Sequence, residues 1–284
     1  MIPANQFSAR CEQENNQEDL RKHTCFKAIW ISDVHLGTSQ CRAERLLEFL
    51  QLTQSESLYL VGDIVDSWEL KRQWYWNQSQ NEVVQAIIEK ANRGTKVVFI
   101  PGNHDESFRK FIGLDLSGIQ VRDELIHTTA AGLRMLVLHG DRFDGVVSGA
   151  WWLRWCGKAL TPTVLTLLQK VNNLRGRAGF PYWSLSQYLG LPIRRASNYL
   201  SSFEQAVARE ARQKGLDGVI CGHVHKPEIR EIDGVLYCND GDWVEHQSAL
   251  IEELSGELRL VTWQDIVVQS DRARLCEELA LAEL

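Results

Sequence analysis

The chain of 284 residues is long enough for one large domain, or for one domain that carries an insertion. Its 44% hydrophobic and 24% charged residues are typical of a globular protein, and no stretch approaches the roughly 18 consecutive apolar residues of a membrane-spanning helix. The net charge of −6 disfavours a general nucleic-acid binder, so no nucleic-acid partner is expected. The seven cysteines form no Cys-x-x-Cys pair, so we expect neither a disulfide framework nor a thiolate zinc site, and a cytoplasmic location is favoured.

The first part of the chain alternates strand and helix patterns. Residues 1–24 are polar, have no apolar periodicity and lack a secretory signal, which predicts a disordered leader. The segments that follow are predicted as strand 26–31, helix 41–52, strand 57–61, helix 81–92 and strand 96–100. This order predicts a parallel sheet with right-handed crossovers, with the loops that follow the strands on one edge.

The later part of the chain adds further strands. Residues 132–138 and 217–221 are each predicted as a strand that runs into histidine. Antiparallel hairpins are predicted from four alternating segments joined by Gly-containing turns, at 228–232, 235–238, 249–253 and 258–263. Residues 265–284 are predicted as a C-terminal helix or tail. The complete pattern predicts an α/β fold whose main domain spans residues 25–264.

Residues 145–203 differ in composition from the rest of the chain. They contain seven Lys or Arg residues and no Asp or Glu, together with a group of tryptophans at Trp151, Trp152 and Trp155. We interpret this segment as a basic, aromatic helical insertion, while an ordinary packed helical subdomain remains the alternative.

Polar side chains of metal-binding type follow the predicted strands. They are Asp33, His35, Asp63, Asn103, His139, His223 and His225. Carboxylate, amide and imidazole donors without thiolates suit Mn²⁺, Fe²⁺ or Zn²⁺. Counting His104, five of the eight histidines lie at these strand ends, which packing alone does not explain.

The number of donors predicts two ions rather than one. A D-x-H or H-x-H step in an extended segment places both side chains on one side, and Asp63 has two oxygens with which to bridge. A pair of divalent ions lowers the pKa of a shared water and holds the attacking and leaving oxygens of a phosphoryl displacement. The predicted reaction class is hydrolysis at phosphorus.

The motif series D-x-H, G-D-x-x-D, G-N-H-D, H-G-D and G-H-x-H resembles the calcineurin-like metallophosphoesterases over about residues 27–263. The resemblance implies a four-layer α-β-β-α sandwich of two mixed sheets. It implies that one ion is held by Asp33, His35, Asp63 and His225, and the other by Asp63, Asn103, His139 and His223. It further implies that His104 is a catalytic group without a metal bond, and that Asp105 orients it.

Within that superfamily, the chain resembles the bacterial UDP-2,3-diacylglucosamine pyrophosphohydrolases of lipid A synthesis, on the stretches 60–76, 181–187 and 239–245. One residue departs from the pattern, since well-understood members carry Arg at the position of His104. The resemblance implies cleavage of a glycolipid nucleotide to UMP and 2,3-diacylglucosamine 1-phosphate, with two ions, most simply Mn²⁺. The insertion is then a lid that binds substrate through Trp151, Trp152, Trp155, Arg154, Lys158, Arg194 and Arg195.

Such a lid also predicts peripheral contact with an anionic membrane surface on the cytoplasmic face. Two alternatives stay open at this point. One is a different metallophosphoesterase, such as a phosphatase or a nucleotide phosphodiesterase, and the other is a protein-binding scaffold without activity. The sequence does not indicate an oligomeric state.

Overall fold

The computed structural model describes residues 23–144 and 186–282, with the side chains of 186–198 and 277–282 left out. Internal contacts divide the chain into two compact units, one formed by Met1–Asp141 with Ala208–Leu284 and the other by Arg142–Val207. The sheets and the candidate site described below belong to the first unit. Most of the predicted leader and most of the 145–203 segment lie outside the described residues.

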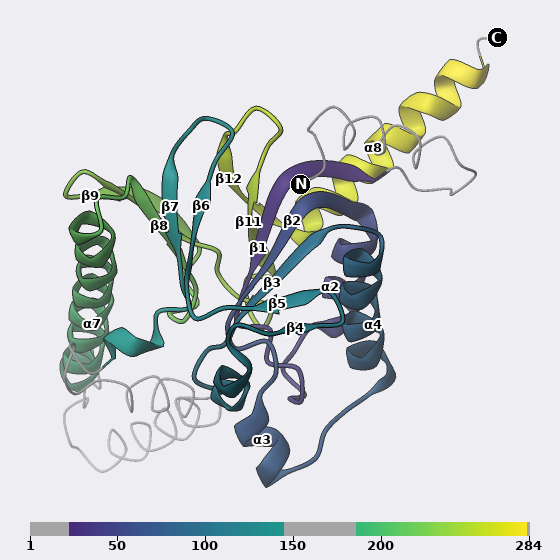
Figure 1. The fold of residues 1–284 in the computed structure, drawn as a ribbon. Helices are drawn as coiled ribbons and strands as arrows, with labels where there is room; N and C mark the ends of the chain where they lie inside the picture. Colours follow the sequence, from purple (N-terminus) through teal and green to yellow (C-terminus); the bar gives the residue numbers. More distant parts are fainter. Residues whose placement is uncertain (1–22, 145–185, 283–284) are drawn as a thin grey trace, which may run out of the picture. The chain divides into compact units, whose positions relative to one another are not determined.

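A seven-stranded mixed sheet has the order β12-β11-β1-β2-β3-β5-β4 (Figure 1). Neighbours from β1 to β5 in this order run parallel, whereas β4, β11 and β12 pair antiparallel. The strands are β1 (Thr24–Ile31), β2 (Thr53–Val61), β3 (Lys96–Ile100), β4 (Asp115–Leu116), β5 (Ile119–Val121), β11 (Ser248–Glu252) and β12 (Leu258–Thr262). Parallel β1, β2 and β3 bring their carboxyl ends to one edge of the sheet.

A second mixed sheet has five strands in the order β6-β7-β8-β10-β9. Its central strands β7, β8 and β10 are parallel, and the outer strands β6 and β9 are antiparallel to their neighbours. The strands are β6 (Leu125–Thr128), β7 (Arg134–Val137), β8 (Gly218–Cys221), β9 (Glu228–Ile232) and β10 (Val235–Asn239). The two mixed sheets with helices confirm the predicted fold class.

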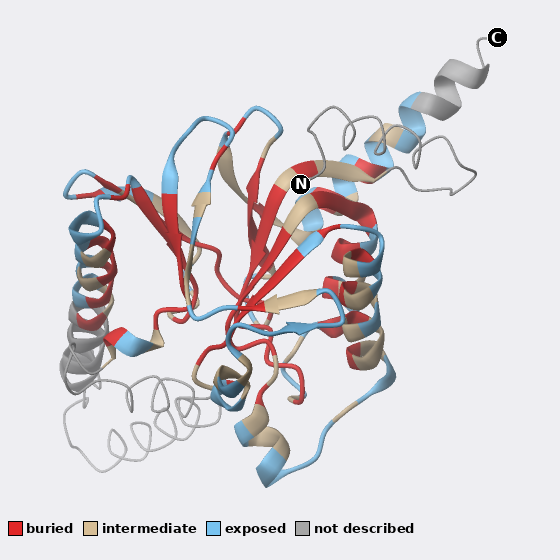
Figure 2. Ribbon diagram, in the orientation of Figure 1, coloured by how far each residue is buried: buried red, intermediate tan, exposed pale blue. Residues whose placement is uncertain are grey.

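The described part of the chain contains five α-helices. They are α2 (Ala43–Leu52), α3 (Ser67–Arg72), α4 (Gln78–Asn92), α7 (Ser186–Gln213) and α8 (Trp263–Ala282), with short 3-10 helices η1 (Glu106–Phe111) and η2 (Asp141–Phe143). Leu46 and Phe49 of α2 and Val83 of α4 share a core with Ile29 and Ile31 of β1. Helices α2 and α4 therefore cover one face of the seven-stranded sheet, where Figure 2 shows their buried sides.

The opposite face of the same sheet forms a second core. Ala28 and Trp30 alternate along β1 with the residues that face the helices, and they pack with strands of both sheets. The Trp30 ring stacks on Tyr59 with centroids 5.2 Å apart. His127 of β6 donates to or accepts from Tyr59 Oη at 2.9 Å, and its Nε2 lies 2.7 Å from the fully buried carboxylate of Glu252. These contacts of His127 with Tyr59 and Glu252 connect the two sheets, which agrees with a structural role for His127.

The structure adds elements that the sequence did not predict. Helix α3 and strands β4, β5 and β6 are short, so they carry too few residues for a periodic signal.

Cys25 is disulfide-bonded, although the cysteine spacing predicted no framework, and Cys41, Cys221, Cys238 and Cys276 are free thiols.

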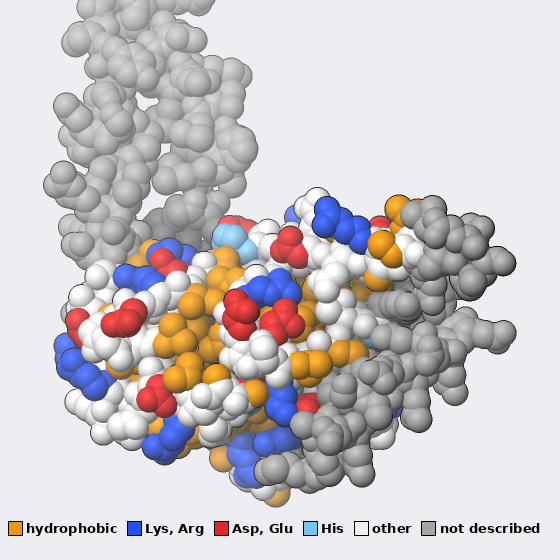
Figure 3. All heavy atoms as spheres, turned by 90° about the horizontal axis from the view of Figure 1, so that it is seen from above, with side chains coloured by type: hydrophobic (Ala, Val, Ile, Leu, Met, Phe, Trp, Pro, Cys, Tyr) orange, Lys and Arg blue, Asp and Glu red, His pale blue; other side chains and the backbone are white. Residues whose placement is uncertain are grey.

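Among the described side chains on the face shown in Figure 3, acidic and basic ones are interspersed with hydrophobic ones. None of the helices in the described part of the chain combines the length and the apolar character that crossing a membrane requires.

Candidate metal centre

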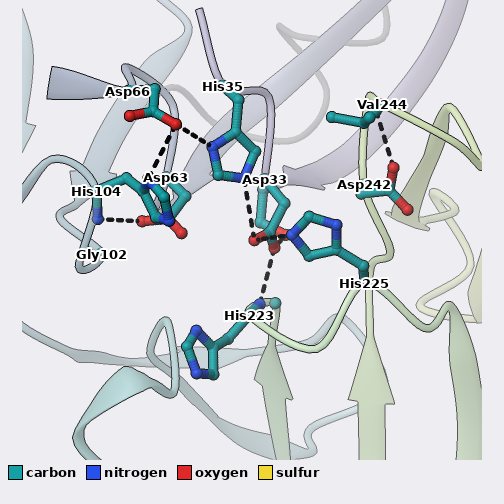
Figure 4. Close-up of polar contacts among 12 residues, drawn as sticks. Asp33, His35, Asp63, Asp66, Gly102, His104, His223, His225, Asp242 and Val244 are labelled. Carbon is teal, nitrogen blue, oxygen red and sulfur yellow. Dashed lines mark hydrogen bonds and ion pairs between the residues drawn. The ribbon is translucent and has the colours of Figure 1, made fainter. Parts of the chain in front are cut away.

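The candidate ligands lie in loops at the carboxyl ends of strands from both sheets. Asp33 and His35 follow β1, Asp63 follows β2, and Asn103 with His104 follows β3. From the second sheet, His139 follows β7, and His223 with His225 follows β8. Segments far apart in the chain thus converge on one site (Figure 4).

The donor atoms form three groups, each with all of its donors within 4.8 Å of one another. They are Asp33 with His35 and His225, His35 with Asp63 and His104, and Asp63 with His139 and His223. His35 and Asp63 each occur in two groups, so the groups are contiguous. This arrangement matches two neighbouring cation positions that share Asp63.

Individual distances within these groups are short. Asp33 Oδ1 lies 2.9 Å from His225 Nε2 and 3.9 Å from His35 Nε2. Asp63 Oδ2 lies 3.5 Å from His139 Nε2. Carboxylate oxygens and imidazole nitrogens at these separations can bind a common ion with small side-chain movements.

Two observations on this structure show that the residues fit divalent ions. Asn103 Oδ1 and His139 Nε2 are buried, and neither makes a hydrogen bond within the described part of the chain. Buried polar atoms without a hydrogen bond are rare in proteins and indicate a missing ion or water. The second observation is the room that glycines leave around the donors.

Three glycines lie directly against the donor groups. A Cβ atom at Gly62 would lie 2.3 Å from the His139 ring, and one at Gly102 would lie 2.3 Å from Asp63 Oδ1. A Cβ atom at Gly222 would lie 2.6 Å from Asp33 Oδ2. The Gly residues of the G-D, G-N-H-D and G-H-x-H motifs are therefore required by close packing around the donors.

The backbone of the site is held in an uncommon conformation. Asp33, His35, Asp63, His223 and His225 all have φ between 51° and 71°, in the left-handed region that non-glycine residues rarely adopt. The prediction that D-x-H and H-x-H lie in extended segments is therefore wrong. The side chains converge because the chain turns at each of these residues, and such strain is typical of functional sites.

Hydrogen bonds between the loops hold these turns. Asp33 N donates to Gly62 O at 3.0 Å, and His35 N donates to Asp63 O at 2.9 Å. Asp33 Oδ2 accepts from His223 N at 2.8 Å and from Ser32 Oγ at 2.7 Å. The loops after β1, β2 and β8 are thus fixed to one another around Asp33.

His104 stands beside the donor groups with Asp66 as its partner. Its Nδ1 lies 2.9 Å from Asp66 Oδ2, and the same oxygen accepts from His35 Nδ1 at 3.1 Å. Figure 4 shows the Asp66 carboxylate between the two imidazoles. Asp66 therefore orients the candidate ligand His35, and it also holds His104.

Asp105 does not orient His104, which corrects the prediction. Its carboxylate is fully buried and accepts from the backbone N–H groups of Gly102 at 2.6 Å, Ile64 at 2.8 Å and Val65 at 3.3 Å. Asp105 therefore joins the loops after β2 and β3. Adjacent residues point in different directions here, so sequence proximity selected the wrong carboxylate.

Burial and charge act in opposite directions on the pKa values of the site. Burial alone would raise the pKa of Asp33 and Asp63, but neighbouring histidines, His225 for Asp33 and His139 for Asp63, lower both below the usual range. Burial lowers the pKa of His139, but the charge of Asp63 outweighs it and raises that pKa to about 10. A cation bound to the His139 imidazole would compete with its proton for the ring nitrogen.

His104 and Asp105 also have shifted pKa values. Burial lowers the pKa of His104, yet the contact with Asp66 and the charge of Asp63 raise it above its ordinary value overall. Burial and the charge of Asp63 raise the pKa of Asp105 to about 6.

The predicted substrate-binding residues are not described by the structure. Trp151, Trp152, Arg154, Trp155 and Lys158 lie outside the described residues, and Arg194 and Arg195 lie in α7 without described side chains.

Sequence reasoning missed further residues that support the site. Ser32 Oγ contacts Asp240 Oδ1 at 2.6 Å as well as Asp33 Oδ2 at 2.7 Å. For Ser32 the only signal in the sequence was its position next to Asp33, which does not distinguish it from other neighbours of motif residues.

The site combines three contiguous carboxylate-imidazole donor groups at the carboxyl ends of the strands, an arrangement typical of a metal-dependent phosphoester hydrolase. The calcineurin-like phosphoesterase family matches residues 26–227, and the chain belongs to this family. Divalent ions are the cofactors of such an enzyme.

Curated relatives carry a more specific name. The chain is 26% identical over 260 residues to a UDP-2,3-diacylglucosamine hydrolase of Haemophilus influenzae, covering 84% of this chain and 99% of the relative. It is 28% identical over 257 residues to the enzyme of that name from Aeromonas hydrophila, covering 82% and 96%. A third relative of the same name, from Azotobacter vinelandii, is 26% identical over 211 residues, covering 72% and 83%.

Proposed function

We propose that the protein hydrolyses the pyrophosphate bond of UDP-2,3-diacylglucosamine and releases UMP and 2,3-diacylglucosamine 1-phosphate. The observation that carries the reaction class is the series of three contiguous donor groups that are linked through His35 and Asp63. The relatives named UDP-2,3-diacylglucosamine hydrolase, matched over 83% to 99% of their lengths in the cases above, support the substrate.

The proposed ligand sets are those implied by the family resemblance. Asp33, His35, Asp63 and His225 would hold one ion, and Asp63, Asn103, His139 and His223 would hold the other. Three members of each set lie within 4.8 Å of one another, namely Asp33, His35 and His225 in the first and Asp63, His139 and His223 in the second. Mn²⁺ fits this mixture of carboxylate, amide and imidazole donors, and Fe²⁺ or Zn²⁺ fits it as well. When bound, two such ions activate a water and neutralise charge on the phosphoryl group.

The chain's own residues supply orientation and a proton. His104 Nδ1 faces Asp66, so Nε2 is the ring nitrogen left for substrate. A protonated His104 would stabilise charge on the phosphoryl oxygens or donate a proton to the leaving phosphate oxygen. Asp66 holds the imidazole for this role, while Asp105 fixes the loop that carries it.

Residues 145–203 are proposed to bind the rest of the substrate. Their seven cationic side chains suit a diphosphate, and their tryptophans suit acyl chains. The same composition supports peripheral contact with an anionic membrane on the cytoplasmic side.

The experiment compares two substrates for the Mn²⁺-loaded protein. Hydrolysis of UDP-2,3-diacylglucosamine in detergent, with UMP as product, supports the proposal. Hydrolysis of bis-p-nitrophenyl phosphate without any release of UMP would leave the family assignment standing and refute the substrate.

Two variants test the residues. Asp63→Ala removes the shared donor and is expected to abolish hydrolysis of either substrate, and His104→Ala is expected to lower kcat about 10²-fold or more. Asp115→Asn is the control, because Asp115 is an exposed residue of β4 whose side chain accepts from Gly118 N at 2.7 Å, a bond that an asparagine oxygen can keep. Full activity in Asp63→Ala would contradict a catalytic site at these strands.

A further inference from the structure

Trp68 makes a ring contact with His104. The two ring centroids are 4.4 Å apart, with 38° between the ring planes. We propose that Trp68 is a positioning residue that holds the His104 imidazole in its working orientation, an inference that rests on the proposed hydrolytic role of His104.

The imidazole is confined from several directions. His35 meets it nearly perpendicularly, with centroids 4.7 Å apart and 88° between the planes, and Asp66 lies at its Nδ1. Trp68 adds a broad aromatic surface to this set. Rotation of the His104 side chain toward α3 would bring it into the indole, so Trp68 limits the orientations of Nε2.

The backbone of His104 is fixed by the same stretch of chain. His104 O accepts from Ser67 N at 3.0 Å and from Ser67 Oγ at 2.6 Å, and His104 N donates to Asp63 Oδ1 at 2.8 Å. Three consecutive residues therefore hold different parts of His104, since Asp66 contacts the ring nitrogen, Ser67 the carbonyl and Trp68 the ring.

Packing of a hydrophobic core does not account for Trp68. Helix α3 has six residues and none of them is buried, and the Trp68 side chain is 46% exposed. The helix start is held instead by Asp66, whose Oδ1 accepts from Glu69 N at 2.8 Å. Replacing Trp68 is therefore expected to leave the fold intact while it releases one side of His104.

An aligned acid group contributes to the chemical step more than to substrate binding. General acid catalysis is worth about 10²–10⁴-fold, and poor alignment forfeits part of it. We therefore expect Trp68→Ala to lower kcat about tenfold with KM within about twofold, and Trp68→Phe, which keeps an aromatic surface, to recover most of the loss.

The test is a double-mutant cycle with bis-p-nitrophenyl phosphate and the Mn²⁺-loaded protein. If Trp68 acts through His104, Trp68→Ala lowers kcat in the wild type and has no further effect in His104→Ala. Trp74→Ala is the matched control, because Trp74 follows α3 closely in the chain and its side chain is 75% exposed. Its kcat is expected to equal that of the wild type.

A second readout needs neither metal nor activity. Protons of an imidazole over an aromatic face are shifted upfield, so the His104 ring signals, assigned by their absence in His104→Ala, should move downfield in Trp68→Ala. They should not move in Trp74→Ala.

Additive losses in the cycle, an unchanged kcat in Trp68→Ala, a wild-type kcat in His104→Ala, or His104 signals unmoved by Trp68→Ala would each overturn the inference. Because the cycle uses a generic phosphodiester, it is decided independently of whether UDP-2,3-diacylglucosamine is the substrate. Failure of the proposed substrate and failure of this inference are therefore distinguishable.

Discussion

The Asp66 carboxylate performs two tasks that can be separated by replacing it with asparagine. Its Oδ1 accepts from Glu69 N at 2.8 Å as the N-cap of α3. Its Oδ2 lies 3.1 Å from His35 Nδ1 and 2.9 Å from His104 Nδ1. Asparagine has one acceptor oxygen and one NH₂ group, so it satisfies only one of these two tasks.

Either orientation of the substituted asparagine side chain has a defined cost. With its oxygen toward Glu69, the amide NH₂ faces two imidazole nitrogens that need an acceptor. With its oxygen toward the imidazoles, α3 loses its cap, which costs about 1 kcal/mol. Loss of a partner that orients a metal ligand typically lowers metal affinity or activity about 10–100-fold. We expect Asp66→Asn to show a loss in that range with a melting temperature within a few degrees of wild type.

The assay is Mn²⁺ titration and steady-state hydrolysis of bis-p-nitrophenyl phosphate, alongside thermal melts. The pH dependence of kcat/KM should also shift, and the direction of the shift can be predicted. The contact with Asp66 is a main cause that raises the pKa of His104, so removing the Asp66 charge should move the high-pH loss of kcat/KM to lower pH. Wild-type metal affinity and kcat in Asp66→Asn, with an unshifted profile, would refute the orienting role.

Three further predictions concern the glycine beside His139, the buried Glu252 carboxylate and the binding of ions. Gly62→Ala should lose bound metal and about 1–3 kcal/mol of stability, because its Cβ would lie 2.3 Å from the His139 ring and residue 62 has a φ of 83°. Metal content and denaturation measure the two losses, and a variant that binds metal fully would show that the loop has room for the Cβ. Glu252→Ala should cost about 3–5 kcal/mol in urea unfolding, because His127 and Ala130 N lose a fully buried partner, and a loss below about 1 kcal/mol would contradict this. Mn²⁺ binding should release protons and strengthen as pH rises from about 6 to 8, since the charge of Asp63 raises the pKa of His139 to about 10 in the metal-free site. Calorimetry in buffers of different ionisation enthalpy measures the proton release, and binding without proton release would contradict this prediction.

The strand ends and their donors were predictable because each motif combines a β-branched run with a polar loop. Parallel strands β1, β2 and β3 bring their loops to one edge of the seven-stranded sheet, and parallel strands β7 and β8 bring theirs to one edge of the five-stranded sheet. The donor groups around Asp63 follow from this arrangement. The left-handed turns that aim the side chains do not, since Asp and His carry no signal for them in the sequence.

Contacts between distant segments account for what the sequence left undecided. The choice between Asp66 and Asp105 as the partner of His104 depends on how the loops after β2 and β3 meet. Asp105 is the nearer of the two in sequence, but its carboxylate is directed at backbone N–H groups. The pairing of His127 with Glu252 spans 125 residues and is likewise decided by the packing of two sheets.

The contacts that maintain the strained backbone of the site also hold the donors in place before an ion binds. A non-glycine residue in the left-handed region costs about 1–3 kcal/mol and persists only where the surroundings determine it. At Asp33 and His35 those surroundings are the hydrogen bonds to Gly62 O and Asp63 O. Little of the binding free energy of an ion is then lost to ordering of the loops.

His104 is held in a different way. It is not among the described residues with positive φ, and the orientation of its ring depends on contacts with the side chains of Asp66 and Trp68. Trp68 is 46% exposed and can change without rebuilding the strained loops that carry the candidate ligands, but Asp66 also contacts His35. A change at Trp68 is therefore expected to alter the proposed catalytic imidazole while the donor set stays intact, whereas a change at Asp66 is expected to affect both.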